Sequence, residues 1–466
     1  MRVMLIRFNV RNFLSFFQTD EGKSVEFSMI SGKGSRKRDR IFDDGTLKLL
    51  KTAAIYGANA SGKSNFVKAM SFMKHTMLYG LPKGHTELYC KIKKENQNQA
   101  SYFEMEICLD DKYYAYGFEV ILSQGKFVSE WLVELCKDKE KIIFSRDIPS
   151  GKYDFGKDLT DGPDIKKLTV YMEDIKSDYS ILFLQIMNRN KDGFYASVKE
   201  SKSKKSLVFQ KLYHWVNKRL DINYPDEPIS NYSYLAKSED IDTVCKMISY
   251  FDTGIRDVKV ENIPLEKALE VMPDPMKEDV KENIERISSI LQSGEIIEGG
   301  LFIRAGRDFY IFKVEHQEII CQTIRFEHES KGVFFNLPEE SDGTIRLLQL
   351  LEILLVNENK TYVIDELDRC LHPMLTYRFM EIFLDLAKKR NVQLIFTTHE
   401  SRLLNFELFR RDEVWFVNKD ENGASEVYSL DEYNERFDKK LDKAYLEGRY
   451  GGVPVFDLMF PLKGDE

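Results

Sequence analysis

The residues from Gly57 to Ser64 read GANASGKS and match the phosphate-binding pattern GxxxxGK[ST]. In such a loop the glycines let the backbone curl, so that successive N–H groups face phosphate oxygens. Lys63 is then expected to reach the β- and γ-phosphates, and the Ser64 hydroxyl to ligate Mg²⁺. The pattern therefore predicts binding of ATP with Mg²⁺. The expected contact residues are Gly57, Ala58, Asn59, Ala60, Ser61, Gly62, Lys63, Ser64 and Asn65.

A phosphate loop of this kind needs a strand before it and a helix after it, and both are expected here. Residues 49–56 form a plausible buried strand. Apolar residues then fall on one helical face, at Phe66, Val67, Ala69, Met70 and Met73. The strand, loop and helix arrive in the required order, which separates this match from an ordinary glycine-rich turn.

A second candidate site lies some 300 residues further on, where the apolar strand Thr361–Ile364 ends in Asp365 and Glu366. Asp365 is placed to hold Mg²⁺, and Glu366 to orient and deprotonate an attacking water. Acidic pairs also end ordinary strands at solvent edges. The parts that surround this pair favour the catalytic interpretation.

Two further segments carry polar residues at element ends. Ser341 and Gly343 open a helix that continues to Leu351, and a serine and glycine there form either an anion site or an ordinary N-cap. His399 ends the buried strand 392–398, where a lone histidine is most often structural.

In this order and spacing, the four parts resemble the ABC class of ATPases. The resemblance implies that Ser341 and Gly343 of one subunit close over the γ-phosphate held by another, and that His399 is the switch histidine. It also implies a glutamine at a strand end that couples the γ-phosphate and metal to the rest of the molecule, for which Gln185 is the candidate.

Narrower features resemble SMC and DNA-repair ATPases and the OLD family, and above all compact ATPases of bacterial phage-defence and abortive-infection operons. RloA and the AriA subunit of the PARIS system belong to that group. The features are the opening segment 8–16, the loop 56–65, the segment 340–344, His372-Pro373, the segment 411–416 and the segment 445–454. The resemblance implies a separately encoded effector, often a TOPRIM-type nuclease, and a phage protein or DNA as trigger. Only some 50 residues follow Trp415, and they lack a TOPRIM pattern.

Composition limits the setting of the protein. No run of the 466 residues approaches the roughly 18 to 20 apolar residues of a membrane span, so no membrane partner is expected. The six cysteines are scattered without a C-x-x-C pair, which favours a reducing cytoplasm and disfavours structural zinc. The net charge of −8 gives no global nucleic-acid footprint, although Lys202–Lys205 is a local basic run.

The sequence predicts an α/β fold, a P-loop NTPase of the ABC-type ATPase head with an antiparallel β layer and an inserted helical region. The expected parts are a first ATPase lobe over 1–205, a mostly helical insert over 206–300, and a second lobe with C-terminal tail over 301–466. The antiparallel layer is expected from alternating segments at 4–27 and 102–135.

Three function classes follow from these observations. The first is a defence ATPase that pairs its heads as a homodimer or higher oligomer and drives an effector. The second is an SMC-like DNA-repair ATPase, which should carry a coiled coil or a basic groove. The third is a transporter ATPase subunit, which should carry L-S-G-G-Q. The chain shows neither of these last two sets of features, which favours the first class.

Overall fold

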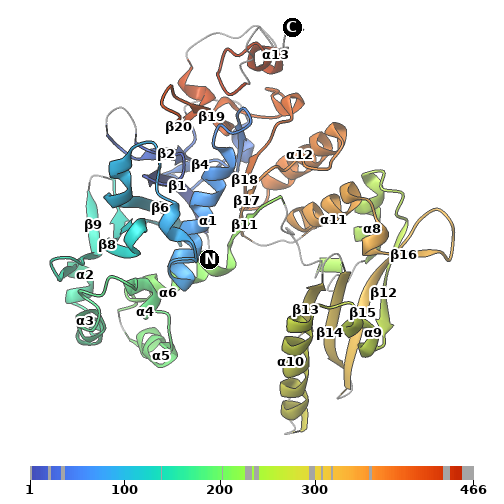
Figure 1. Ribbon diagram of the computed structural model, residues 1–466, viewed down its shortest axis with the longest axis horizontal. Helices are drawn as coiled ribbons and strands as arrows, with labels where there is room; N and C mark the ends of the chain where they lie inside the picture. Colours follow the sequence, from blue (N-terminus) through green and yellow to red (C-terminus); the bar gives the residue numbers. More distant parts are fainter. Residues whose placement is uncertain are drawn as a thin grey trace, which may run out of the picture. The chain divides into compact units, whose positions relative to one another are not determined.

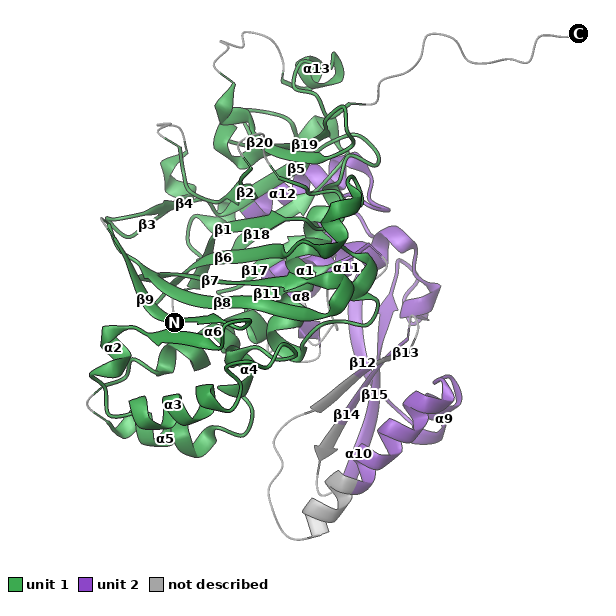
Figure 2. Cartoon of the chain, turned by 60° about the vertical axis from the view of Figure 1, so that its left-hand side comes forward, with its two compact units in different colours: residues 1–223, 358–367, 384–466 green, residues 224–357, 368–383 purple. Residues whose placement is uncertain are grey.

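The computed structural model describes residues 3–18, 22–32, 37–137, 139–201, 203–225, 234–235, 241–292, 300–305, 308–315, 318–355, 359–433 and 441–453. The chain divides into two compact units (Figure 2). Unit 1 comprises residues 1–223, 358–367 and 384–466. Unit 2 comprises residues 224–357 and 368–383.

A mostly parallel sheet forms the centre of unit 1 (Figure 1). Its order is β11-β17-β18-β5-β19-β20, and only the pairing of β20 with β19 is antiparallel. The strands are β5 (Thr52–Tyr56), β11 (Leu220–Asn223), β17 (Thr361–Ile364), β18 (Gln393–Thr397), β19 (Val414–Lys419) and β20 (Ser425–Ser429). All residues of β5, β17 and β18 are buried, as expected for parallel strands covered on both faces.

A second, fully antiparallel sheet of unit 1 has the order β10-β9-β8-β7-β6-β1-β2. Its strands are β1 (Val3–Arg11), β2 (Val25–Ser28), β6 (Ser101–Leu109), β7 (Lys112–Ile121), β8 (Lys126–Leu135), β9 (Glu140–Asp147) and β10 (Lys152–Phe155). In β6 and β8, buried residues alternate with more exposed ones, which is the pattern of a sheet packed on one face. The antiparallel layer expected from the sequence is confirmed.

Helix α1 (Lys63–Tyr79) joins the phosphate loop to the antiparallel sheet. The Phe66 ring contacts Phe8 of β1 and Phe27 of β2, with ring centroids 5.7 and 5.0 Å away. Gln393 of β18 ties the two sheets together, because its amide nitrogen donates to the Leu5 carbonyl and its amide oxygen accepts from the Leu5 N–H. The remaining elements of unit 1 are β3 (Phe42–Asp43), β4 (Lys48–Leu49), α2 (Lys157–Thr160), α3 (Ile165–Glu173), α4 (Phe183–Ile186), α5 (Asp192–Glu200), α6 (Leu207–Lys218) and α13 (Leu441–Leu446).

Unit 2 is built on an antiparallel sheet of order β12-β15-β14-β13, with β16 paired to β15. Its strands are β12 (Asp257–Ile263), β13 (Gly300–Ala305), β14 (Asp308–Glu315), β15 (Glu318–Glu327) and β16 (Phe334–Asn336). Its helices are α8 (Ile241–Tyr250), α9 (Leu265–Glu270), α10 (Asp274–Gln292) and α11 (Asp342–Leu355), while α12 (Pro373–Ala387) runs from unit 2 into unit 1. Ala268 and Val280 of the helices pack on Tyr310, Phe312 and Cys321 of the sheet.

The expected domain boundaries differ from these units. Helix α6 and strand β11 were expected in the insert but belong to unit 1. The expected boundary at 300 separates β12 from β15, yet these strands pair over the whole of β12. The described part of 206–300 therefore combines helices with strands. Its strand β12 joins this region to the later residues of the same sheet by pairing with β15. Residues 226–233, 236–240 and 293–299 of that region lie outside the described residues.

Candidate functional site

The phosphate loop connects the buried strand β5 to α1, as the sequence predicts. Gly62 precedes α1 with φ of 117°, and a Cβ there would lie 2.2 Å from the Ser425 hydroxyl. Only glycine fits such a position without strain. The Lys63 ammonium donates to the carbonyls of Gly57 (2.7 Å) and Ala58 (3.0 Å), which holds the charged group within the curl of the loop.

A cluster of small polar side chains fixes the far side of this loop. The Ser425 hydroxyl of β20 donates to the Ser61 carbonyl (2.6 Å) and lies 2.7 Å from the Ser15 hydroxyl. Asn65 donates its amide N–H to the same Ser15 hydroxyl (2.8 Å). Residues from both ends of the chain therefore hold the loop in place. The Ser61 hydroxyl is buried without a hydrogen-bond partner.

The acidic pair follows β17, two strands away from β5. Asp365 is 2% exposed, and its Oδ1 accepts a hydrogen bond from the Thr397 hydroxyl of β18 (2.6 Å). The same hydroxyl accepts from the Glu366 backbone N–H (2.8 Å). Glu366 has φ of 49°, a left-handed conformation that is uncommon for residues other than glycine and clusters at functional sites. One threonine therefore orients both acidic residues, and the sequence reasoning missed it.

The parallel register brings these parts to one edge of the sheet. Ile364 pairs with Phe396, Thr397 pairs with Ile55, and strands lie about 4.8 Å apart, so the loop and the acidic pair are about 10 Å from each other. Ligands of open parallel sheets bind at the carboxyl ends of the strands. His399 follows β18 at this same edge and is exposed.

Asn223 is a further residue at this edge. It ends β11, and its carbonyl accepts from the Asp365 N–H (2.9 Å). Its side-chain nitrogen is buried without a hydrogen-bond partner. Burying an unsatisfied donor costs free energy of folding, and a bound ligand that accepts its hydrogen bond would remove this cost. The sequence carries no local signal for it, because its position depends on the pairing of β11 with β17.

Gln185 does not reach this edge, which corrects the sequence expectation for that residue. It lies in the short helix α4 rather than at a strand end. Its amide nitrogen donates to the Thr76 carbonyl and its amide oxygen accepts from the Leu182 N–H. Thr76 is 13 residues after Lys63 on α1, and so about 20 Å along the helix from the loop. The amide nitrogen therefore holds α4 to α1, and the amide oxygen caps the start of α4, away from the loop.

Ser341 and Gly343 lie in unit 2, at the start of α11. The Ser341 hydroxyl accepts from the Thr344 N–H (3.1 Å) and acts as an N-cap. A Cβ on Gly343 would lie 2.8 Å from the Cys370 carbonyl, so this position requires glycine. Ser341 itself is exposed, which leaves the helix start open to an anion.

The residues of the sheet edge fit ATP with Mg²⁺. The Ser61 hydroxyl and the Asn223 amide are buried polar groups with unused hydrogen-bonding capacity. Ser64 and Asp365 offer hydroxyl and carboxylate oxygens, which are the ligands that Mg²⁺ prefers alongside phosphate oxygens and water. In the part of the chain that the structure describes, no group of three or more His, Cys, Asp or Glu side chains is arranged to hold a metal ion.

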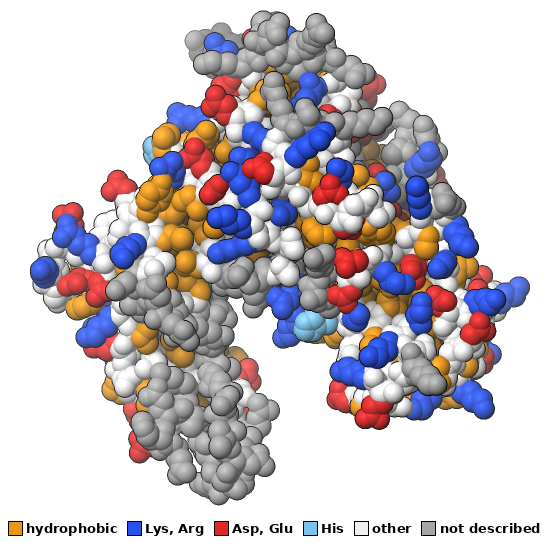
Figure 3. Space-filling model, turned by 180° about the vertical axis from the view of Figure 1, so that it is seen from behind, with side chains coloured by type: hydrophobic (Ala, Val, Ile, Leu, Met, Phe, Trp, Pro, Cys, Tyr) orange, Lys and Arg blue, Asp and Glu red, His pale blue; other side chains and the backbone are white. Residues whose placement is uncertain are grey.

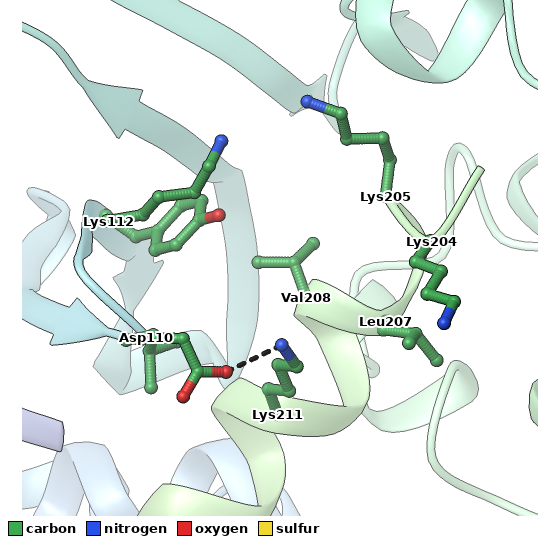
Figure 4. Close-up of a pocket in the computed structure, with 9 residues that line it drawn as sticks. Asp110, Lys112, Lys204, Lys205, Leu207, Val208 and Lys211 are labelled. Atoms are coloured by element: carbon green, nitrogen blue, oxygen red, sulfur yellow. Dashed lines mark hydrogen bonds and ion pairs between the residues drawn. The ribbon is translucent and has the colours of Figure 1, made fainter. Parts of the chain in front are cut away.

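A pocket elsewhere in unit 1 is lined by the basic run noted in the sequence (Figure 4). Lys204 and Lys205 precede α6, and Lys205 points toward the side of Lys112, the first residue of β7, while Lys204 points away from it. Lys205 pairs with Asp158, Lys112 with Glu134, and Lys211 with Asp110. Most of the positive charge is therefore neutralised within the protein. Lys202 lies outside the described residues.

Residues 53–405 match the family model described as "AAA domain, putative AbiEii toxin, Type IV TA system". The match covers well over half of the chain. The chain belongs to this family. An AAA domain is an ATP-binding domain, in agreement with the loop and the acidic pair at one sheet edge. The fold class expected from the sequence, an ABC-type P-loop head with an antiparallel layer, is confirmed.

Three solved structures show a weak similarity to the chain. They are an SMC head bound to the C-winged helix domain of ScpA (15% identity, 91% of this chain and 97% of that chain, TM-score 0.40), the SMC head domain from Thermotoga maritima (13%, 92% and 99%, 0.36), and the Smc head with an extended coiled coil bound to the C-terminal domain of ScpA from Pyrococcus furiosus (14%, 96% and 99%, 0.37). No curated protein matches the sequence. None of the described helices has the length and apolar character needed to span a membrane.

Proposed function

We propose that the protein binds ATP with Mg²⁺ at the carboxyl edge of the parallel sheet and hydrolyses it. The observation that carries this proposal is the phosphate loop after β5 beside the Asp365–Glu366 pair after β17, with Thr397 between them. The loop supplies backbone N–H groups and the Lys63 ammonium to the phosphates. The pair supplies two carboxylates, of which Asp365 is buried and Glu366 is partly exposed.

Each residue of this edge has a distinct role in the proposal. Ser64 and Asp365 hold Mg²⁺, which neutralises charge on the phosphates when bound. Glu366 accepts a proton from the attacking water. Asn223 takes the coupling role that the sequence assigned to Gln185, because it ends the neighbouring strand, its carbonyl accepts from the Asp365 N–H, and its side-chain nitrogen is buried without a partner. His399 contacts the γ-phosphate from the end of β18.

The site is completed by a second copy of the chain. Ser341 and Gly343 begin a helix whose first N–H groups and dipole attract an anion. In the ABC class this segment serves the nucleotide of the opposite subunit. ATP would therefore favour the association of two heads, since it binds the paired state more tightly than the single one.

The substitution Glu366→Gln tests hydrolysis at this site. The amide keeps the shape of the side chain but cannot accept a proton, so ATP binding should persist while phosphate release falls by ~10²- to 10⁴-fold. Lys63→Ala serves as the control, because it should remove ATP binding itself. Near wild-type hydrolysis by Glu366→Gln would contradict the proposed role of this carboxylate.

The biological role that we propose is defence against phage, with the ATPase acting as a sensor or scaffold for a separately encoded effector such as a TOPRIM-type nuclease. Two things support it: the abortive-infection name of the family, and the resemblance of the motifs to the group of RloA and AriA. Purification with the products of neighbouring genes tests the proposal, and a co-purifying nuclease is the expected result.

The main alternative is an SMC-like ATPase of DNA repair. Such a protein needs a basic face that releases counterions from the phosphate backbone. On the face shown in Figure 3, the described basic and acidic side chains are interspersed, and the net charge is −8. Strong stimulation of ATP hydrolysis by DNA alone, with no co-purifying effector, would favour this alternative.

A further inference from the structure

The segment 441–453, here called the C-terminal strap, folds against the phosphate loop within unit 1. It consists of α13 and a glycine-rich turn in which Gly448, Gly451 and Gly452 all have positive φ. Tyr445 and Tyr450 are only 6% and 1% exposed, so the strap is anchored by buried aromatic rings. Pro454, the last residue of this motif in the sequence, lies outside the described residues.

The strap contacts the first glycine of the loop directly. A Cβ on Gly452 would lie 3.2 Å from the Gly57 Cα. Gly57 is itself closely surrounded, because a Cβ there would lie 2.5 Å from both the Val417 carbonyl and the Ser61 hydroxyl. Two glycine backbones, almost 400 residues apart in sequence, are therefore packed against each other at the nucleotide loop.

The Tyr445 side chain connects the strap to the strand that precedes the loop. Its hydroxyl donates to the Gly452 carbonyl (2.9 Å), and its ring packs edge-on against Tyr56, the last residue of β5 (5.7 Å between centroids). Burial raises the pKa of Tyr445, while a hydrogen bond from the backbone of Gly57 opposes that rise. The phenol thus holds the strap through its hydroxyl and contacts the strand that leads into the loop through its ring.

We propose that Tyr445 and Gly452 are positioning residues of the nucleotide site, which hold Gly57 in the backbone conformation that binds the phosphates. This inference rests on the proposed function. The affinity of a phosphate loop depends on N–H groups that already point at the ligand, because ordering them on binding would cost free energy. The Gly57 backbone leads into those groups, so loosening it should weaken ATP binding.

A pair of matched variants tests the role of the phenol. Tyr445→Phe removes the hydroxyl that donates to the Gly452 carbonyl. Tyr428→Phe removes a similar hydroxyl, whose bond goes to the Tyr450 carbonyl (2.6 Å) and so anchors the strap at Tyr450 rather than at Gly452. With Mg²⁺-ATP as the probe, Tyr445→Phe should raise Kd by roughly three- to tenfold, the loss expected for one hydrogen bond. Tyr428→Phe should change the melting temperature to a similar extent but leave Kd within about twofold of wild type.

A second pair tests the contact between the glycines. Gly452→Ala places a methyl group against Gly57, whereas Gly448→Ala strains the same strap at a similar φ, with its methyl group against Val453. Only Gly452→Ala should weaken ATP binding. This pair remains informative if either tyrosine variant folds poorly.

The outcomes separate this inference from the proposed function. If wild type and Lys63→Ala both fail to bind ATP, the nucleotide site itself is wrong. If wild type binds and Lys63→Ala does not, the proposed site stands and the strap variants decide the inference. Kd values that change equally within each pair, or not at all, would overturn the role of Tyr445 and Gly452.

Discussion

At the scale of single residues, Thr397 is the least obvious part of the candidate site. Its hydroxyl donates to Asp365 and accepts from the Glu366 N–H, so one atom orients the proposed metal ligand and the proposed base. The side chain is fully buried. A buried network in which every polar group has a hydrogen-bond partner makes a site rigid.

The substitution Thr397→Val removes this hydroxyl while keeping the shape of the side chain. Asp365 and the Glu366 N–H each lose a partner, so we expect hydrolysis to fall by at least about tenfold, equivalent to the ~1–3 kcal/mol of a buried group left unsatisfied. More Mg²⁺ should be needed for half-maximal rate. Thr397→Ser keeps the hydroxyl and should restore both. Equal losses in the two variants would point to packing rather than to the hydrogen bonds.

The sequence predicted the strand, loop and helix around Gly57–Ser64 and the strand before Asp365, because each is a local pattern. It could not place residues whose role depends on strand order. Gln185 was chosen for its residue type at an apparent strand end, but it belongs to α4, where a buried amide satisfies two backbone groups. Asn223 lies beside Asp365 only because β11 pairs with β17, and no local pattern reveals that pairing.

At the scale of elements, the short helical turn Arg411–Glu413 precedes β19, at the edge of the sheet opposite the nucleotide site. Glu413 is 1% exposed and accepts from the Arg410 N–H (2.8 Å). Burial raises the pKa of Glu413 to about 7, although the Arg410 hydrogen bond opposes the rise. The folded protein therefore holds this proton more tightly than the unfolded chain does.

This buried carboxyl makes stability depend on pH. Because its pKa is raised by folding, its favourable contribution is present below pH about 4.5 and is lost as the pH rises through about 7. The loss amounts to about 3 kcal/mol at most. Glu413→Gln cannot ionise. The melting temperature of this variant, minus that of wild type, should therefore increase between pH 5 and pH 8. Melting curves that shift in parallel would show that Glu413 does not titrate in this range.

At the scale of the whole molecule, the motifs that the proposal assigns to nucleotide binding belong to two different units. Unit 1 carries the loop, the acidic pair and His399, and unit 2 carries Ser341 and Gly343. The sequence could not define the units, because the chain passes from one to the other several times. The segment 358–367 belongs to unit 1 although it lies between two segments of unit 2, and α12 begins in unit 2 and ends in unit 1. In the proposed dimer, each ATP is bound by unit 1 of one copy and capped by unit 2 of the other.

The dimer can be tested by combining two inactive variants. Ser341→Arg should leave the loop intact while its bulk blocks closure over the partner's ATP, and Lys63→Ala should leave the helix start intact while removing ATP binding. A mixed pair then holds one site with both lesions and one with neither. With free subunit exchange, equal mixing should restore about one quarter of wild-type hydrolysis, because half of randomly formed pairs are mixed and each has one intact site.

Ser341→Asp separates the capping role of Ser341 from its role toward the phosphate. Aspartate is as good an N-cap as serine, so the stability of α11 should be kept, whereas its negative charge would repel the γ-phosphate of the partner. We therefore expect wild-type melting with strongly reduced hydrolysis, and recovery on mixing with Lys63→Ala. Normal hydrolysis by both Ser341 variants would make the serine a simple helix cap. If exchange is shown by tagged pull-down and mixing restores nothing, the two heads do not share their sites in this way.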